Sequence, residues 1–223
     1  MKKTKGFLVA AGIVLAIAFI FSCSSDDGGG GGDNSQGGNG SVTYKGQKYR
    51  TVKIGEQVWF AENLNYAVGG SRCYDNLDSN CNIYGRLYDW STAMAFPSSC
   101  NSNSCSSQIQ FMHKGICPDG WHIPSDAEWR VLIDYAGDYN KLKAKSGWND
   151  NGGTDDYGFS ALPGGVGYSV GSFNDVGNFG YWWSASEYDS YYAYYRSMYY
   201  YLAYAYWIEI NKSILFSVRC LQD

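Results

Sequence analysis

The sequence is poor in histidine and proline and has no excess of positive charge. Its 223 residues include 2 His and 4 Pro, and 17 Lys and Arg stand against 21 Asp and Glu, for a formal net charge of −4. Few histidines leave few imidazoles for metal binding or acid–base catalysis. An acidic balance argues against a nucleic-acid partner. Because 45% of the residues are hydrophobic and 17% aromatic, a disordered chain is excluded and a packed domain is expected.

The first 22 residues, 1–22, have the pattern of an export signal. Lysines at positions 2, 3 and 5 precede an apolar stretch over residues 7–21, which is shorter than the roughly 20 residues of a membrane-spanning helix. The stretch ends in Ile-Phe-Ser-Cys23, which resembles the lipobox of bacterial lipoproteins. The resemblance implies cleavage after residue 22 and acylation of Cys23. A plain signal peptide with an incidental cysteine is the alternative.

A flexible tether is expected over residues 23–42, because the segment is rich in glycine and serine. It begins with Ser24-Ser25-Asp26-Asp27, which resembles the acidic surface-export signal that follows the lipidated cysteine in Bacteroidetes lipoproteins. We therefore expect an outer-membrane lipoprotein that displays its domain, residues 43–223, at the cell surface. A lipoprotein that faces the periplasm on the same spacer is the alternative.

Six cysteines remain once Cys23 is assigned to the lipid, and an even number in an exported chain is typical of disulfides. The short spacings favour bonds between Cys73 and Cys81 and between Cys100 and Cys105. Cys117 and Cys220 would then join the middle of the domain to its C-terminal end. The connectivity itself stays open at this point. The paired C-x-x-C knuckles of a zinc site do not occur in the sequence.

The order of expected elements indicates an α+β domain. Alternating residues over 44–60, with a turn at Gly55-Glu56, predict a hairpin. Apolar residues at helical spacing predict a helix over about 85–96. Ser125 followed by Glu128 is a capping box and predicts the start of a second helix. Short strands are expected over 181–184, 194–201, 205–210 and 216–221.

Five separated motifs carry a family resemblance. They are Thr51-Val-Lys-Ile-Gly-Glu-Gln-Val-Trp59 with Ala61-Glu-Asn-Leu64, Cys117-Pro-Asp-Gly-Trp-His-Ile-Pro-Ser125 with Ala127-Glu-Trp129, Gly158-Phe-Ser-Ala-Leu-Pro-Gly-Gly165, Trp183-Ser184 and Phe216-Ser-Val-Arg-Cys220. Together they resemble the Fibrobacter succinogenes major paralogous domain over nearly all of residues 44–222. The resemblance implies a fold related to C-type-lectin-like domains and formylglycine-generating enzymes, with two helices, a twisted antiparallel sheet and a long loop-rich insertion. It also implies an exported lipoprotein, but no particular activity.

Tyrosine is concentrated in one C-terminal stretch, because ten of the 21 tyrosines fall within residues 188–206. Strand propensity explains part of this enrichment. However, side chains alternate between the two faces of a strand, so neighbouring tyrosines such as Tyr191 and Tyr192 must place rings on both. Some of these rings are therefore expected to face solvent or a ligand.

The same stretch resembles the variable region of proteins diversified by retroelements, in which varied residues lie between framework segments, here Ala193–Arg196 and Asn211–Ser213. Tyrosine and small residues also dominate antibody paratopes, because tyrosine offers a large, rigid contact area. We therefore expect a recognition surface, with strand packing alone as the alternative. The candidate ligand-binding residues are Tyr188, Asp189, Tyr191, Tyr192, Tyr201, Ala203, Tyr204, Tyr206, Trp207 and Glu209.

Catalytic and metal sites have less support. The related formylglycine-generating enzymes use a reactive cysteine pair, whereas the cysteines here are expected in disulfides. We expect His122 to be packed at the end of a strand, His113 to be isolated in a loop, and the carboxylate pairs Asp155-Asp156 and Glu187 with Asp189 to be solvated turn residues. No metal or other cofactor is expected. A structural Ca²⁺ held by loop oxygens is the alternative.

These observations predict a lipid-anchored binding protein of the cell envelope without catalytic activity. Its Tyr-rich face is expected to recognise a glycan or protein on another cell or surface. Two alternatives remain: a formylglycine-generating-type or carbohydrate-active enzyme, and a structural envelope lipoprotein without a specific ligand.

Overall fold

The computed structural model describes residues 40–150, 152–201 and 206–223. All of them fall in the second of the chain's two compact units, Asn34–Asp223. The expected signal peptide, the lipid site at Cys23 and most of the tether lie outside the described residues. Within the described ranges, no helix combines the length and apolar character needed to cross a membrane.

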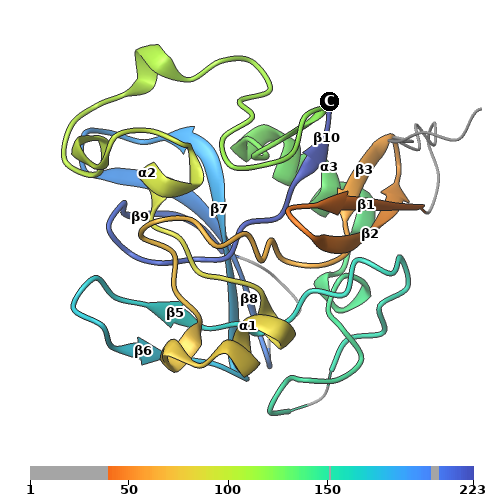
Figure 1. Ribbon diagram of the computed structural model, residues 1–223. Helices are drawn as coiled ribbons and strands as arrows, with labels where there is room; N and C mark the ends of the chain where they lie inside the picture. The colour runs from red at the N-terminus through yellow and green to blue at the C-terminus, as the bar shows by residue number, and fades with distance from the viewer. Residues whose placement is uncertain (1–39, 151, 202–205) are drawn as a thin grey trace, which may run out of the picture. The chain divides into compact units, whose positions relative to one another are not determined.

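The strands form antiparallel sheets (Figure 1). A five-stranded sheet has the order β1-β2-β3-β10-β4, a two-stranded sheet pairs β5 with β6, and a three-stranded sheet has the order β7-β8-β9. Gly40 in β1 pairs with Thr51, so the folded domain already includes the end of the segment predicted as tether. The strands are β1 (Gly40–Tyr44), β2 (Gln47–Ile54), β3 (Gln57–Phe60), β4 (Trp121–His122), β5 (Val166–Gly167), β6 (Phe173–Asn174), β7 (Phe179–Glu187), β8 (Tyr192–Tyr199), β9 (Tyr206–Asn211) and β10 (Leu221–Gln222).

Three α-helices occur in the described residues, one more than the two expected: α1 (Asp78–Tyr84), α2 (Trp90–Ala93) and α3 (Asp126–Ala136). Short 3₁₀ turns cover Tyr74–Asn76, Ser98–Asn101, Ser106–Gln108 and Tyr139–Lys141. The start of α3 is confirmed: Ser125 and Glu128 form the predicted capping box, and the helix ends at Gly137 with a left-handed φ of 67°. Together, the helices and antiparallel sheets make an α+β domain.

The predicted helix over 85–96 is wrong in extent, because only Trp90–Ala93 is α-helical. The side chain of Asp89 accepts a hydrogen bond from the N–H of Thr92 and starts the helix there. Before it, Leu87 and Tyr88 form β-bridges with Arg72 and Phe216. Those long-range pairings hold the chain extended where the apolar spacing indicated a helix.

The predicted hairpin is confirmed, with Ile54 paired to Gln57 across the turn. The strand predicted over 216–221 is wrong in extent, because β10 covers only its end. The preceding part forms single bridges, Phe216 with Tyr88 and Ser217 with Trp182. The C-terminal segment therefore links several elements instead of joining one sheet along its length.

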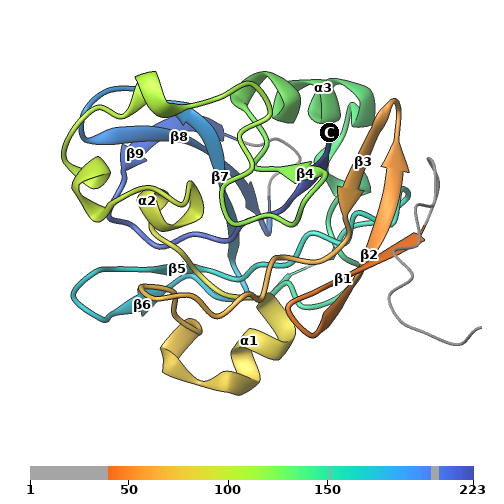
Figure 2. The same ribbon diagram turned by 45° about the horizontal axis from the view of Figure 1, so that its top comes forward.

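The core lies on both faces of β7. Neighbouring residues of a strand point to opposite faces, and here both Trp182 and Trp183 are fully buried. Trp182 packs against Trp129 of α3, and Trp183 packs against Phe216. Figures 1 and 2 show α2 and α3 on opposite sides of this strand. β7 is therefore a rigid central element, and its C-terminal end leads directly into the Tyr-rich stretch.

Three disulfides join the six cysteines of the described residues. They pair Cys73 with Cys81, Cys100 with Cys105, and Cys117 with Cys220, with Cα–Cα distances of 5.0, 5.7 and 5.9 Å. These are the pairs that the spacings favoured. The last bond joins the segment before β4 to the segment before β10, two strands that are neighbours in the five-stranded sheet.

Candidate recognition surface

The turn between β7 and β8 carries three exposed tyrosines. Tyr188, Tyr191 and Tyr192 are 53%, 54% and 41% exposed. We call residues 188–192 the Tyr turn. It gathers four of the predicted ligand-binding residues, including Asp189, within five positions of the chain.

Asp189 shapes the Tyr turn. Its Oδ1 accepts hydrogen bonds from the N–H groups of Tyr191 and Tyr192, at 2.7 and 2.9 Å. The N–H groups of Tyr188 and Asp189 both donate to the carbonyl of Tyr192. A carboxylate that bonds backbone groups two and three residues ahead closes a tight turn. Asp189 therefore holds the backbone of the Tyr turn in this conformation, and the backbone in turn orients the tyrosine rings around it.

A buried ion pair lies beneath the Tyr turn. The ammonium of Lys212 contacts the carboxylate of Glu187, and the two side chains are 0% and 4% exposed. Lys212 also donates from Nζ to the carbonyl of Ser190, at 3.1 Å, and from its backbone N–H to the carbonyl of Tyr191, at 2.9 Å. Its ammonium lies 4.7 Å from the ring centroid of Trp90. The pair therefore joins the Tyr turn to the end of β9 and to α2.

The expectation that Glu187 is a solvated turn residue is wrong. Burial opposes ionisation, but the hydrogen bonds from Lys212, Cys105 and Ser104 outweigh it and lower the pKa of Glu187 below its ordinary value. The N–H of Cys105 and the hydroxyl of Ser104 donate at 2.9 and 2.7 Å. The small loop closed by the Cys100–Cys105 disulfide thus supports the Tyr turn from below.

The other end of β8 carries a second tyrosine group. The ring of Tyr201 contacts those of Tyr199 and Tyr200, and Tyr201 is 59% exposed. β8 spans eight residues, which puts Tyr192 and Tyr199 about 23 Å apart at roughly 3.3 Å per residue. Within the described part of the Tyr-rich stretch, the exposed rings therefore lie in two groups at opposite ends of the strand, and a compact ligand can contact only one of them.

Some tyrosines of the stretch belong to the core. Tyr195 is 8% exposed, packs against Phe216 with ring centroids 5.0 Å apart, and has a pKa raised by burial to about 12. Tyr194, on the opposite face of β8, packs edge-on against Tyr188. Strand packing thus explains Tyr195, whereas it leaves the exposed rings of the Tyr turn unexplained.

The remaining predicted site residues fall at or beyond the limits of the described structure. Ala203 and Tyr204 lie outside the described residues. The backbones of Tyr206 and Trp207 pair with Ser197 and Arg196 across β8 and β9. Glu209 lies opposite Tyr194 and is partly exposed.

Among the catalytic alternatives, His122 is enclosed as expected. Its ring is 1% exposed and lies between Glu128, 3.0 Å from Nε2, and Asp223, 2.8 Å from Nδ1. His113 is not isolated: Nδ1 accepts from the N–H of Gln110, and Nε2 donates to the carbonyl of Met94. Asp155 accepts hydrogen bonds from the backbone and hydroxyl of Ser160. All these groups have structural partners.

The His122 contacts predict a pH dependence of stability. Burial lowers the pKa of His122, but hydrogen bonds to Glu128 and Asp223 outweigh it, so the pKa lies above its ordinary value of 6.5. The protonated form is bound more tightly in the folded state. This stabilisation is complete below about pH 6.5 and is lost as the pH rises through the raised pKa. We expect urea unfolding to give a lower free energy at pH 8.5 than at pH 6.

An NMR titration of the imidazole checks the cause. Asp223→Asn removes one carboxylate partner, so the pKa of His122 should fall relative to that of the unaltered protein. At the acid side, the same contacts together with Ser125 lower the pKa of Glu128 to about 2 despite burial, so stability should also decline as the pH falls from 4.5 towards 2. An unshifted His122 in the folded protein would contradict this interpretation.

The residues that sequence reasoning missed are the two charges of the buried pair. The sequence places Lys212 only in a framework triplet and predicts that Glu187 faces solvent. A lysine between Asn211 and Ser213 in a stretch with few other charges was the available signal, but its partner lies 25 positions away in the chain.

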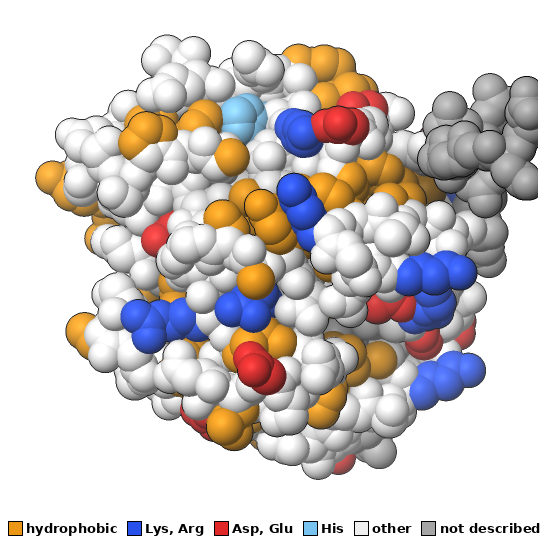
Figure 3. Space-filling view, viewed as in Figure 1, with side chains coloured by type: hydrophobic (Ala, Val, Ile, Leu, Met, Phe, Trp, Pro, Cys, Tyr) orange, Lys and Arg blue, Asp and Glu red, His pale blue; other side chains and the backbone are white. Residues whose placement is uncertain are grey.

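On the face shown in Figure 3, charged side chains of both signs are interspersed among uncharged ones, unlike the basic stripe of a typical nucleic-acid-binding surface.

Comparison with known proteins identifies one family. Residues 52–222 match the model of the Fibrobacter succinogenes major domain. The matched range runs from within β2 to the end of β10 and so includes the Tyr turn, the buried ion pair and all three disulfides. No curated protein and no solved structure matches the chain.

Proposed function

The chain belongs to the Fibrobacter succinogenes major domain family, and on this premise we propose that it is a lipid-anchored binding protein of the cell envelope. The domain is proposed to have a C-type-lectin-like fold and to recognise a glycan or protein on another cell or surface. The Tyr turn is proposed as the main contact. The signal peptide, lipidation of Cys23, display at the outer membrane and diversification of the Tyr-rich stretch by a retroelement belong to the same proposal.

The observation that carries the proposal is that the Tyr turn combines exposed tyrosine rings with a backbone held by buried contacts. Three rings are 41–54% exposed, while the backbone beneath them is held by Asp189 and by the buried pair of Glu187 and Lys212. Ordering flexible side chains and loops opposes association. A turn that is already ordered avoids much of this cost, and tyrosine adds contact area with few rotatable bonds.

The enzyme alternative has weaker support. A formylglycine-generating-type reaction would use thiols, whereas the six cysteines of the described residues are joined in disulfides. His122, which has the strongest electrostatic contacts of the two histidines, is 1% exposed and held on both ring nitrogens. A general base must reach the proton that it abstracts, and this ring has no exposed nitrogen to do so.

Replacing Tyr188, Tyr191 and Tyr192 together by serine is expected to weaken ligand binding by about 100-fold, since tyrosine is among the residues that dominate interface energies. The free energy of unfolding should fall by only about 1 kcal/mol, because the three side chains are about half exposed. The measurement is binding of the full-length protein to a glycan array and to intact cells by flow cytometry, beside urea unfolding of each variant.

Tyr135→Ser is the matched control, because Tyr135 is 56% exposed but lies on α3. It should bind as the unaltered protein does. Tyr201→Ser tests the other end of β8 and should weaken binding much less than the triple variant. The proposal would be contradicted if the triple variant bound as well as the unaltered protein, or if the unaltered protein bound no glycan or cell tested. Either result would favour a structural envelope lipoprotein without a specific ligand.

A further inference from the structure

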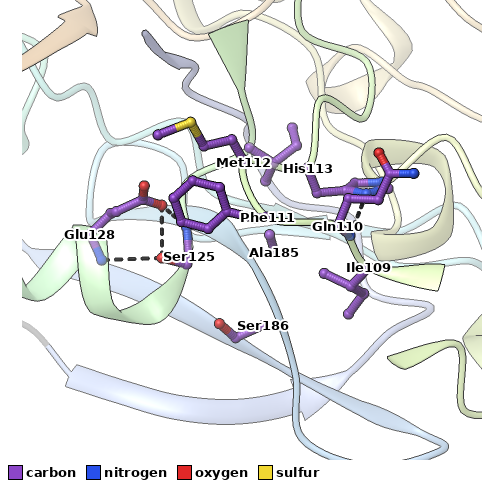
Figure 4. A pocket seen from close by; sticks show the side chains of 10 residues that line it. Ile109, Gln110, Phe111, Met112, His113, Ser125, Glu128, Ala185 and Ser186 are labelled. Carbon is purple, nitrogen blue, oxygen red and sulfur yellow. Dashed lines mark hydrogen bonds between the residues drawn. The ribbon is translucent and has the colours of Figure 1, made fainter. Parts of the chain in front are cut away.

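A pocket of about 220 Å³ lies beside the N-terminal end of α3, apart from the three exposed rings of the Tyr turn. Its lining comes from three parts of the chain: the loop over residues 109–113, the segment from Ile123 to Glu128, and Ala185 with Ser186 of β7. Figure 4 shows Ser125 and Glu128 on one side, Ile109 and Gln110 on the other, and Ala185 between them. The wall is thus mixed: Ser125 and Glu128 stand at the helix end and Gln110 and His113 on the loop, while Ile109, Phe111, Met112, Ile123 and Ala185 supply the apolar part.

Phe111 is the most unusual residue of this pocket, because its side chain is 88% exposed. A large aromatic ring so exposed loses the stabilisation of burial. Its neighbour Met112, 39% exposed, has a positive φ of 52°, a backbone conformation that non-glycine residues seldom adopt. Such costs are often found at binding sites. Phe111 lines the same pocket as Ser125 and Glu128, and Figure 4 draws its ring on their side of the view.

The loop that carries Phe111 is held in place by His113. One ring nitrogen of His113 accepts the N–H of Gln110 at 3.3 Å, and the other lies 2.8 Å from the carbonyl of Met94. A carbonyl only accepts, so Nε2 is the donor in this bond. The ring also packs against Phe96, with centroids 4.8 Å apart. The loop is therefore tied to the end of α2, and the exposed Phe111 projects from a supported backbone.

The pocket has a carboxylate at one end. Glu128 is the one Asp, Glu, Lys or Arg among the ten lining residues. Its Oε1 contacts Nε2 of His122, and its Oε2 accepts hydrogen bonds from Ser125. These bonds lower the pKa of Glu128 to about 2 despite its burial. Each carboxylate oxygen has further lone pairs, and 26% of the side chain is exposed, so the carboxylate can still receive a cation in the pocket. An aromatic ring and a carboxylate that line one pocket are a combination that suits organic ammonium groups.

We propose that this pocket binds a small organic ammonium ion with an apolar body, the ammonium lying towards Glu128 and the body between Phe111 and the apolar wall. A cavity of about 150 Å³ holds a benzene ring in another protein. The pocket of about 220 Å³ therefore has room for an aromatic or aliphatic body of that size with a short amine. The site extends beyond the proposed function, since it needs no contact with the exposed tyrosines.

Benzylamine, which is protonated at pH 8, is a suitable probe, and benzyl alcohol is its uncharged counterpart of nearly equal shape. Titration of the full-length ¹⁵N-labelled protein should show saturable shifts of the amide signals of Phe111, Met112, Ala185 and Ser186. Benzylamine is expected to bind about five-fold more tightly than benzyl alcohol, in keeping with a cation–π and charge contribution at a partly exposed site. Equal affinity for the two probes, or the absence of saturable shifts, would overturn the proposal.

Phe111→Ala should weaken benzylamine binding about five-fold without loss of stability, because the ring is exposed. Val170→Ala is the matched control, since Val170 is also 88% exposed and does not line the pocket.

Glu128→Gln should remove the preference for benzylamine over benzyl alcohol while the glutamine still serves the capping box. The triple serine variant of the Tyr turn should retain benzylamine binding, so that failure of this site and failure of the proposed recognition surface are distinguishable. Unchanged binding in Phe111→Ala would refute the assignment.

Discussion

Replacing Lys212 by methionine is expected to lower the free energy of unfolding by about 3–5 kcal/mol, the usual cost of removing one partner of a buried ion pair. The carboxylate of Glu187 would remain 4% exposed with no cation beside it. The carbonyl of Ser190 and that of Asn103 would each lose a hydrogen bond from Nζ. Urea unfolding measures the loss, and faster hydrogen exchange at the amides of Tyr191 and Tyr192 would report the loosened Tyr turn.

A double variant separates charge from packing. Lys212→Met with Glu187→Leu removes both charges and fills the space with apolar side chains, which is often neutral for stability. We expect it to recover most of the lost free energy but not the order of the Tyr turn. The bond from Lys212 to Ser190 is still absent, and the double variant also loses the bonds from Ser104 and Cys105 to Glu187. A single variant that costs less than about 1 kcal/mol would show that the pair is not a structural support.

Removal of the Cys117–Cys220 disulfide by alanine at both positions is expected to cost about 4–5 kcal/mol. The bond closes a sequence separation of 103 residues, and the loss of chain entropy in the unfolded state grows with the length of the closed loop. The Cys100–Cys105 bond closes a separation of only 5 residues, so its removal should cost about 2 kcal/mol on the same relation.

The comparison of these two paired-alanine variants is the test, made by denaturant unfolding under non-reducing conditions. All four cysteines are buried, so both alanine variants lose packing and the expected difference between them comes from the loop lengths. Equal losses in the two variants would contradict the loop-length argument and would point to strain or packing as the dominant contribution.

Features that depend on neighbouring residues were predictable. The capping box at Ser125, the turn of the β2–β3 hairpin and the two short disulfide loops each involve residues a few positions apart. These interactions join residues that are close in the chain, so they can be predicted without knowing which distant segments pack against them. The third disulfide followed because two cysteines remained once the short loops were assigned.

Features that depend on distant partners were mispredicted or missed. Leu87 has helical spacing with Trp90, but bridges to Arg72 and Phe216 hold this stretch extended up to Asp89. Glu187 has the surroundings of a surface turn in the sequence, but Lys212 and the Cys100–Cys105 loop enclose it. The pocket under Phe111 had no sequence signal, because three segments far apart in the chain form its walls.

The sequence by itself therefore determined the α+β class, the family and the concentration of tyrosine near the C-terminus, and it favoured the disulfide pairs that the structure shows. Only the tertiary structure decided which rings are exposed and which are buried. Alternation along β8 sends Tyr195 into the core, while the strand's length separates the Tyr turn from Tyr201. Exposure depends on what covers each side chain, and the covering residues, Phe216 among them, come from other parts of the chain.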